Sequence, residues 1–591
     1  MRDKFLPVSK DDLARRGWSE LDIIIVTGDA YVDHPSYAAA MIGRVLEGEG
    51  FKVGVIAQPD WKTTDGFKKL GRPKLFFGVT AGNLDSMVAN YTANKMPRSS
   101  DDYSPGGKAG CRPDRASIIY CNKIREAYPG VSIVLGGIEA SLRRLAHYDY
   151  WSDKVRRSII LDAKADILVY GMGEKQVFEI AHRMRNGEEM RTIDNVRGTV
   201  IARNDIAGLK DHIEIPSFEE VSANKDKFNE AFKIFYREND PVSGHTVVQR
   251  HEKRFVIQLP PAKPLSTDEM DRIYLLDYAY GWHPAYTKEG GVPGFETVRN
   301  SIISHRGCSG ECSFCTLFLH QGRIIQSRSE DSIAEEARRL AKRHGFNGTI
   351  TDIGGPTANL YSAQCLSWEK KGACKNRKCL VPEKCINFKL GYDSALRLWK
   401  RLKGIPGVKH IFVGSGVRYD LLTERYGDEY LKALIAEHIS GQLKVAPEHC
   451  DYNVLKLMNK PSFKAYEKFV EKFDRMNRSL GKKQYLVNYF LSGHPGGDIE
   501  GALELSLYLA RNKIRPEQIQ DYIPLPMTLS AAMYHTGKDP MTGREVYVAR
   551  NPRERKLQRA LIQSRQPNNK RYVLEALKKL DKMHLARKLL P

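Results

Sequence analysis

The chain of 591 residues, with 41% hydrophobic and 28% charged side chains, has the composition of a folded protein with more than one domain. No apolar run approaches the ~20 residues that a helix needs to cross a bilayer, and the charged segment 1–16 has no apolar signal-peptide core. These features exclude an integral membrane protein and a secreted one, and they predict a cytoplasmic location.

The first third of the chain alternates apolar, β-branched runs with helical patterns. Strands are predicted at 21–29, 51–57, 74–79, 131–137 and 165–171. A helical pattern over 37–49 joins the first two runs into a β–α–β unit. The alternation predicts an α/β fold in which residues 1–200 form a doubly wound, Rossmann-like domain around a parallel sheet.

Ligands bind such sheets at the carboxyl ends of the strands. There the sequence places Gly28-Asp29, Gly136-Gly137-Ile138-Glu139 and Gly171-Met172-Gly173-Glu174. The arrangement resembles the cobalamin-binding Rossmann domain that precedes the catalytic domain in one class of radical S-adenosylmethionine (SAM) enzymes. The D-x-H-x-x-G signature for the lower cobalt ligand is absent, so cobalamin is an unfavoured alternative to a vestigial or substrate-binding domain. His34 and His147 are expected to be structural or to contact substrate.

The periodicity weakens over 201–295, which is interpreted as a connecting region with a stiff, Pro-rich linker at 259–264. Residues 296–550 then repeat a strand-and-helix pattern that predicts a partial (β/α)6 barrel of the TIM type. Its strands are expected at 301–307, 348–353, 410–416, 442–449, 484–493 and 519–524.

The first predicted barrel strand leads into Cys308, Cys312 and Cys315, spaced C-x3-C-x2-C. Three thiolates at this spacing can bind three irons of a [4Fe–4S] cluster and leave the fourth open. A structural zinc site would require a fourth ligand nearby. The spacing, with Phe314 before the last cysteine, is the signature of radical SAM enzymes, and a zinc knuckle is the disfavoured alternative.

Long strings across the chain resemble the YgiQ-type radical SAM proteins, a family without a defined substrate. The strings are GGIEASLRR, HYDYW, HRGC-x3-C-x-FC, HQGR, DIGGPTAN, VAPEH and QDYIPLPMT. The resemblance implies a radical SAM barrel behind a cobalamin-domain-like N-terminus. It also implies that the enzyme cleaves SAM reductively with an electron from a donor such as flavodoxin or ferredoxin.

The same resemblance assigns residues around SAM. Cys308, Cys312 and Cys315 ligate the cluster, and Phe314 lies near the adenine. Gly354 and Gly355 meet the SAM amino group through their backbone, Arg418 pairs with the carboxylate as a bidentate fork, and Glu448 binds the ribose hydroxyls. The adenine contact from the fifth strand, Phe490 or Leu491, stays open.

A second group of cysteines follows the second predicted barrel strand, at Cys365, Cys374, Cys379 and Cys385. Four thiols fit a fully ligated structural zinc site or an auxiliary iron–sulfur cluster. Zinc or a structural role is slightly favoured, because the spacing matches neither standard pattern.

The net charge of +22 is concentrated at the C-terminus, where residues 553–591 hold twelve Lys and Arg against three Asp and Glu. A basic tail over 551–591 indicates a polyanionic partner such as RNA, with a solvated helix as an equal alternative. The favoured hypothesis is a radical SAM enzyme that modifies RNA or protein. The alternatives are a radical SAM enzyme for a tetrapyrrole or lipid-like molecule, and a non-catalytic, metal-bearing nucleic-acid-binding protein.

Overall fold

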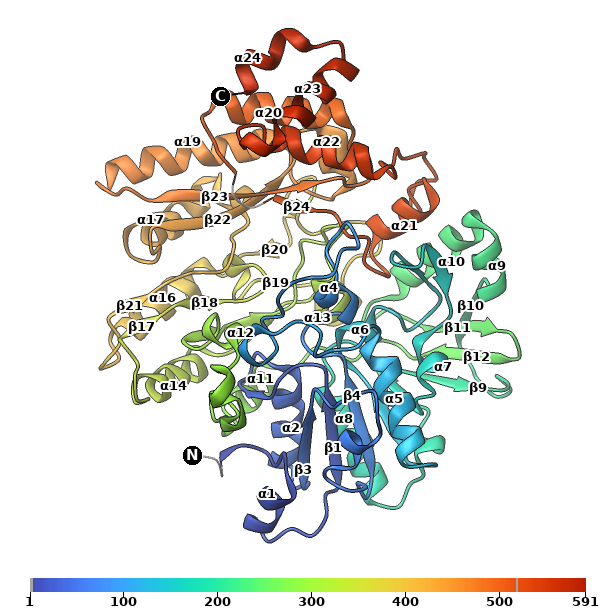
Figure 1. Cartoon of the computed structure of the whole chain (residues 1–591). Coiled ribbons are helices and arrows are strands. Elements are labelled where there is room, and N and C mark those ends of the chain that lie inside the picture. The colour runs from blue at the N-terminus through green and yellow to red at the C-terminus, as the bar shows by residue number, and fades with distance from the viewer. Residues whose placement is uncertain (1–3, 517–518, 591) are drawn as a thin grey trace.

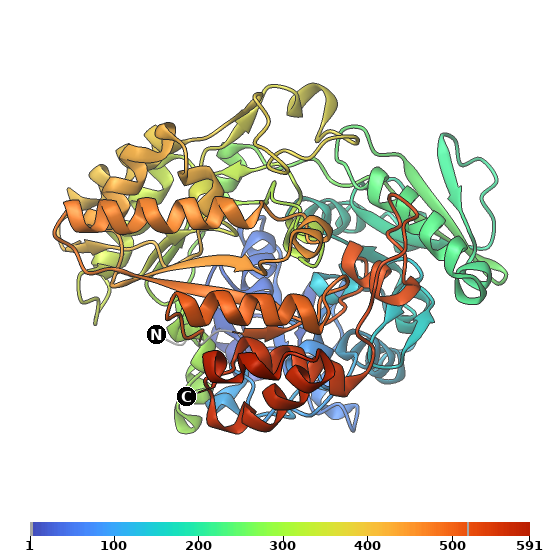
Figure 2. The same ribbon diagram turned by 90° about the horizontal axis from the view of Figure 1, so that it is seen from above.

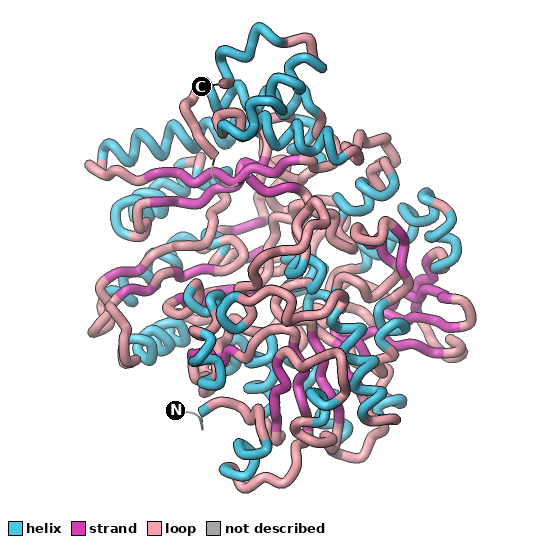
Figure 3. Tube along the Cα trace, in the orientation of Figure 1, coloured by secondary structure: helices cyan, strands magenta, loops and turns pink. Residues whose placement is uncertain are grey.

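The computed structural model describes residues 4–516 and 519–590 and shows an α/β molecule in two halves (Figure 1). Strands and helices alternate along most of the chain (Figure 3). The N-terminal half is built on one large sheet, and the C-terminal half on shorter groups of parallel strands. Among the described residues, no helix is both long and apolar enough to cross a membrane.

A nine-stranded sheet organises the N-terminal half, in the order β10-β11-β12-β9-β8-β5-β4-β1-β3. Its parallel strands confirm the predicted ones: β1 (Ile23–Thr27), β3 (Val53–Ala57), β4 (Phe76–Thr80), β5 (Ile133–Leu135) and β8 (Ile167–Val169). Because parallel strands end at the same edge, their carboxyl ends gather the Gly-rich segments along one line.

Helices cover both faces of this sheet. Ile23 and Ile25 of β1 pack with helices α2 and α8, whereas Ile24 and Val26 pack with α5 and α7 on the other face. Successive strand residues point to opposite faces, so a strand buried on both sides reads as a continuous apolar run. The predicted doubly wound arrangement is confirmed. The covering helices are α2 (Ala38–Gly48), α8 (Glu174–Arg185), α5 (Ala116–Ala127) and α7 (Ile159–Ala163).

Four further strands carry the same sheet beyond residue 200: β9 (Thr199–Arg203), β10 (His212–Ile215), β11 (Thr246–His251) and β12 (Arg254–Gln258). β9 pairs antiparallel with both β8 and β12, and β12 with β11. The structure therefore differs from the predicted boundary at 200 and from the connecting region at 201–295. Strand patterns are local, but the sheet that a hairpin joins is decided by distant pairing.

The C-terminal half contains the predicted succession of short parallel strands. They form three hydrogen-bonded groups, and within the described residues these do not close into a ring. The groups are β14 (Ser301–Ile303) with β18 (Asp352–Gly354), β17 (Thr349–Ile350) with β21 (His410–Ile411), and β22 (Gln442–Glu448) with β23 (Tyr485–Ser492) and β24 (Ile519–Asp521). The result is an open arrangement of seven short strands, in which β17 and β18 together occupy the second predicted barrel strand.

Amphipathic helices cover the outside of this arrangement (Figure 2). Their apolar faces share one core with the strands, as expected when helices alternate with parallel strands. They are α14 (Glu330–Ala341), α16 (Tyr392–Lys403), α17 (Asp428–Glu437) and α19 (Phe463–Ser479). Helix α20 (Ile499–Arg511) packs with β23 and β24 in a separate core.

The basic C-terminal segment is folded. Helices α22 (Pro552–Ile562) and α24 (Ala586–Leu589) pack against α20, and α23 (Lys570–Lys579) packs against α22 and α24 (Figure 2). Leu557, Leu577 and Leu589 are fully buried in the core that these helices share. The segment predicted as a basic tail is thus a helical module with a charged outer surface.

Candidate active site at the junction of the two halves

The three cysteines of the C-x3-C-x2-C motif lie in a loop between β15 (His305–Arg306) and α13 (Leu317–Gln321). Two backbone hydrogen bonds hold the loop. The Cys308 amide donates to the Gly322 carbonyl at 3.1 Å, and the Cys315 amide donates to the Cys312 carbonyl at 2.9 Å. Burial raises the pKa of the Cys308 and Cys315 thiols, and the neighbouring Cys312 raises both further. Three half-buried thiols therefore lie in one loop and influence one another, and metal coordination would favour their thiolate forms.

Arg418 is buried beside this loop. Its Nε and Nη2 atoms donate to the two carboxylate oxygens of Asp420, at 3.1 and 2.8 Å. A side-chain carbon added at Gly310 would lie 3.0 Å from Arg418 Nη1 and 3.3 Å from Cys308 Sγ. The structure differs here from the expected bidentate fork on SAM, because Asp420 occupies that edge. Nη1 is the part of the guanidinium that faces the cysteine loop.

Gly354 and Gly355 lie where the second strand meets the first. A Cβ at Gly355 would lie 2.6–2.8 Å from atoms of the His305 ring, and one at Gly354 would lie 2.3 Å from Ser415 Oγ. Ser304 donates to the Gly354 carbonyl through its amide, at 2.8 Å. Glycine is thus required by close packing inside the protein, and the predicted contact with the SAM amino group stays a prediction.

Glu448 lies close to the cysteine loop, and Phe314 belongs to that loop. Glu448 ends β22 with a φ of 68°, and burial raises its pKa. The nearest cation is Lys460, whose Nζ lies 3.6 Å from Glu448 Oε1, and the carboxylate is close enough to Cys315 to raise the pKa of that thiol. The Phe314 ring packs edge-on against His494, with ring centres 6.0 Å apart. Both positions are compatible with the predicted SAM contacts.

On the fifth strand, Phe490 and Leu491 are both buried in apolar cores. Their proposed adenine contact therefore remains a prediction.

Sequence reasoning missed two residues that organise this region. The Asn359 side chain accepts from the Arg418 amide at 2.9 Å and donates to the Arg418 carbonyl at 3.0 Å, so it fixes that backbone. Thr357 Oγ1 lies 3.6 Å from Cys308 Sγ. Both belong to the string DIGGPTAN, in which the sequence predicted a role only for the two glycines.

Cys379 belongs to a small apolar core against which Cys365, Cys385 and Cys308 pack, whereas Cys374 is exposed. Cys365 and Cys374 are close enough to raise the pKa of Cys379, whose burial is the larger cause. In the ranges that the structure describes, no three His, Cys, Asp or Glu side chains are grouped closely enough to hold one metal ion. This holds for both cysteine groups, so cluster ligation by Cys308, Cys312 and Cys315 and the second metal site both stay predictions.

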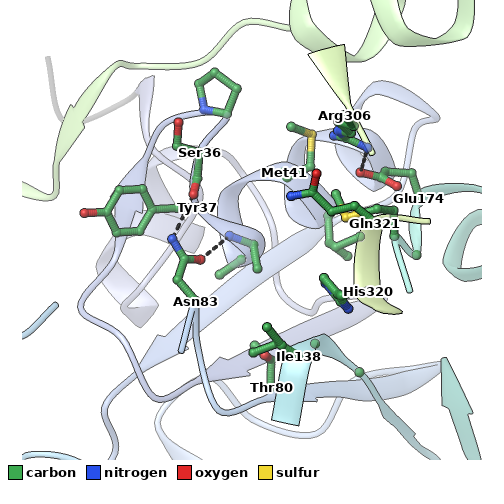
Figure 4. A pocket seen from close by; sticks show the side chains of 18 of the residues that line it. Ser36, Tyr37, Met41, Thr80, Asn83, Ile138, Glu174, Arg306, His320 and Gln321 are labelled. Atoms are coloured by element: carbon green, nitrogen blue, oxygen red, sulfur yellow. Dashed lines mark hydrogen bonds and ion pairs between the residues drawn. The ribbon is translucent and has the colours of Figure 1, made fainter. Parts of the chain in front are cut away.

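A cavity of about 490 Å³ lies between the carboxyl edge of the N-terminal sheet and the first strands of the C-terminal half (Figure 4). Its deep part runs between the sheet and helix α2 and is apolar, with Ile25, Phe76, Val134 and Leu46 in its wall. A Cβ added at Gly78 would meet nothing closer than 3.8 Å. The volume falls in the range of about 300–1,000 Å³ typical of ligand sites.

Several polar side chains also lie in the wall of the cavity, among them Asn83, Glu174 and Arg306 (Figure 4). Asn83 accepts from the Ala38 amide at 3.0 Å and donates to the Ser36 carbonyl at 2.8 Å. Glu174 and Arg306 form a buried ion pair across the two halves, with 2.7 Å between Oε1 and Nη1. Glu174 Oε2 and Arg306 Nη2 have no hydrogen-bond partner among the described residues. An amide-bearing ligand, which both donates and accepts, would satisfy both atoms.

His34 and His147 lie outside the wall of this cavity. His34 Nδ1 accepts from the Ser36 amide at 3.1 Å, and His147 Nδ1 lies 3.0 Å from the Leu145 carbonyl. Burial lowers the pKa of each to about 3. Their contacts agree with a structural role.

Family models and known proteins show which family has this architecture. Residues 5–301 match the family model described as Radical SAM N-terminal, and residues 517–586 match a domain of unknown function, DUF3362. A UPF0313 protein of Clostridium botulinum (strain 657 / Type Ba4) is 52% identical over 581 residues, covering 98% of this chain and 91% of that protein. A UPF0313 protein of Methanocella arvoryzae is 51% identical over 570 residues, covering 96% and 94%.

Among solved structures, the cobalamin-dependent SAM radical enzyme OxsB, with aqua-cobalamin and SAM bound, is similar with a TM-score of 0.50 at 11% identity. The alignment covers 97% of this chain and 73% of that one. At this identity the likeness concerns the fold. The family model over the N-terminal half and the relatives over nearly the whole length show that the chain belongs to the UPF0313 family and is a radical SAM enzyme.

Proposed function

We propose that this enzyme cleaves SAM reductively at a [4Fe–4S] cluster held by Cys308, Cys312 and Cys315. The observation that carries the proposal is the position of the three half-buried thiols in one loop beside the buried guanidinium of Arg418, with Cys312 close enough to raise the pKa of the other two. When bound, the cluster supplies one electron to the sulfonium of SAM, which gives methionine and a 5′-deoxyadenosyl radical that abstracts hydrogen from a substrate carbon.

The residues of the chain would position SAM and exclude water. Arg418 Nη1 is oriented toward the loop because Asp420 and Asn359 hold the rest of that residue. A single charge-assisted hydrogen bond from Nη1 to the SAM carboxylate replaces the fork that the sequence predicted. Glu448, buried close to Cys315, is placed for the ribose hydroxyls.

The test is anaerobic reconstitution of the full chain with iron and sulfide, followed by dithionite and SAM. Formation of 5′-deoxyadenosine is the expected result. Its absence from protein that carries a complete cluster would contradict the proposal. Flavodoxin or ferredoxin is the electron donor that we propose in the cell, and either protein in place of dithionite should sustain the same product.

We further propose that the cavity at the junction holds cobalamin. Three features support this choice over the vestigial or substrate-binding domain: the apolar depth beneath the sheet, the Gly-lined mouth, and the unpartnered Glu174 Oε2 and Arg306 Nη2. Glu174 Oε2 and Arg306 Nη2 would hold side-chain amides of the corrin ring, and the apolar residues of the wall would contact the apolar parts of the cofactor. When bound, cobalamin supplies a cobalt centre next to the SAM site.

Replacing Gly78 by valine should weaken cobalamin binding by about tenfold or more, because the new methyl groups occupy the deep part of the cavity. A tenfold loss of affinity corresponds to about 1.4 kcal/mol of binding free energy. The strand should tolerate the change, since Ile25 Cγ1 is the nearest atom at 3.8 Å and β-branched residues suit strands. Binding is measured by absorbance after gel filtration.

Unchanged formation of 5′-deoxyadenosine would show that the Gly78→Val protein is folded. Equal cobalamin binding by the variant and the parent would contradict the assignment of the cavity.

For the substrate we propose RNA, bound in part by the C-terminal helical module. Lys570, Lys578 and Arg587 are exposed there, without an ion-pair partner among the described residues. Replacing all three by glutamine should weaken RNA binding and reduce the slope of log K against log salt by about 2, because each phosphate contact to a single strand contributes about 0.7. Filter binding over a range of salt concentrations measures both.

A matched control is the triple glutamine variant of Lys62, Lys68 and Lys69, which are equally exposed on the N-terminal half. An equal loss in both variants would indicate a general effect of net charge and contradict an RNA surface on the module. A small-molecule substrate would give no salt-dependent RNA binding in any variant.

A further inference from the structure

His320 lies in the wall of the junction cavity, at the end of helix α13, which follows the cysteine loop (Figure 4). It belongs to the C-terminal half, but its Nδ1 atom lies 3.0 Å from Ser141 Oγ, on helix α6 (Gly137–Ser141) of the N-terminal half. The two residues are 179 positions apart. The SAM chemistry proposed above leaves this histidine without a role.

The hydrogen bonds around Ser141 assign the tautomer of His320. Ser141 Oγ donates to the Gly137 carbonyl at 2.9 Å and accepts from the Gly171 amide at 3.0 Å. A serine hydroxyl has one proton and two lone pairs. Its second lone pair can therefore accept from a protonated His320 Nδ1, and this choice makes three hydrogen bonds where the other tautomer makes two.

With the proton on Nδ1, the Nε2 atom carries a free lone pair. Among the described residues, Nε2 has no hydrogen-bond partner. The atom is not completely shielded from solvent, so a ligand can reach it. Burial lowers the pKa of His320 to about 4, so the ring is neutral at neutral pH. A neutral imidazole whose other N–H is hydrogen-bonded within the protein is the arrangement found in metal-ligating histidines.

Other histidines near the cavity cannot play this part. His305 also lines the cavity, but its Nδ1 lies 2.9 Å from Ser304 Oγ and its Nε2 lies 3.1 Å from the Thr357 carbonyl. Both of its ring nitrogens are thus engaged. His34 and His147 lie outside the cavity wall.

We propose that His320 Nε2 is an axial ligand to the cobalt of a corrinoid bound in the junction cavity, with Ser141 as the positioning residue that holds the tautomer. The inference rests on the proposed binding of cobalamin and adds what that proposal lacks, a protein ligand for the metal. It replaces the histidine that the absent D-x-H-x-x-G signature would provide. The ligand comes from the helix that directly follows the cysteine loop, so about five residues of chain would link the cobalt ligand to Cys315.

The test is the electron paramagnetic resonance spectrum of the full-length protein loaded with cob(II)alamin. One axial nitrogen splits each cobalt line into a triplet when it is ordinary nitrogen and into a doublet when it is nitrogen-15. Protein grown with nitrogen-15-labelled histidine should therefore convert the triplet to a doublet. A triplet that survives labelling would show that the cofactor's own benzimidazole is the ligand and would overturn the proposal.

Variants identify the residue. His320→Ala should lose the histidine splitting while still binding cobalamin through the rest of the cavity, and the control His147→Gln, a buried histidine outside the cavity, should retain it. Ser141→Ala should weaken cobalamin binding by about tenfold, as loss of a group that supports a metal ligand does. A doublet that persists in His320→Ala would assign the ligand elsewhere.

Failure of the two proposals is distinguishable. Protein that binds no cobalamin at all would overturn both, whereas stoichiometric binding without a histidine signature would overturn only the assignment of His320.

Discussion

Replacing Cys312 by alanine is expected to abolish reductive cleavage of SAM and to remove the iron–sulfur absorption of the reconstituted protein. The thiol is one of three that lie in the loop, and its neighbours Cys308 and Cys315 cannot hold a cluster as a pair. Loss of a group that merely supports a metal ligand costs about 10–100-fold in affinity, and loss of a ligand should cost more. Iron content per chain and 5′-deoxyadenosine formation measure the two effects.

The matched control is Cys111→Ala. Cys111 is also a free, half-buried cysteine, but it lies in the N-terminal half and outside the cavity wall. The Cys111→Ala protein should keep its iron content and its formation of 5′-deoxyadenosine. If Cys312→Ala retained a full cluster and formed 5′-deoxyadenosine, the assignment of the loop would be wrong.

Replacing Glu174 by alanine should lower the free energy of unfolding by about 3–5 kcal/mol, the cost of leaving one member of a buried pair uncompensated. Arg306 would then keep only the Tyr274 hydroxyl, which accepts from its Nε at 2.8 Å. Glu174 also opens helix α8, where a carboxylate interacts favourably with the helix dipole. The midpoint of urea unfolding is the measurement.

Two further variants separate the ion pair from other effects. The double variant Glu174→Gln with Arg306→Met should recover much of the loss, because no charge is left buried. Glu126→Ala, which breaks the surface pair with Lys123 at 2.8 Å, should change stability by less than about 1 kcal/mol. A Glu174→Ala protein no less stable than Glu126→Ala would show that the pair does not join the two halves.

The predicted SAM-site residues show which contacts a sequence motif can predict and which it cannot. The spacing of Cys308, Cys312 and Cys315 predicted that their thiols lie in one loop. The first and last cysteines are only seven positions apart, so a loop of this length cannot carry them far from each other. Arg418 lies beside the loop, but the Nε and Nη2 atoms of its guanidinium donate to Asp420, only two residues on, and its contact with the SAM carboxylate stays a prediction. Glycines at 354 and 355 were explained by a ligand, whereas the packing of His305 and Ser415 already requires them.

The sequence by itself determined the strands of the doubly wound sheet, the cysteine loop and the succession of strands in the C-terminal half. Each of these rests on periodicity or spacing among near neighbours. Tertiary structure alone decided that β9 to β12 extend the sheet beyond residue 200, that the basic segment folds onto α20, and that a cavity opens where the two halves meet. The contacts Glu174–Arg306 and Ser141–His320 join residues more than a hundred positions apart. No local pattern encodes such pairs, because they form only when both halves are folded and their edges are brought together.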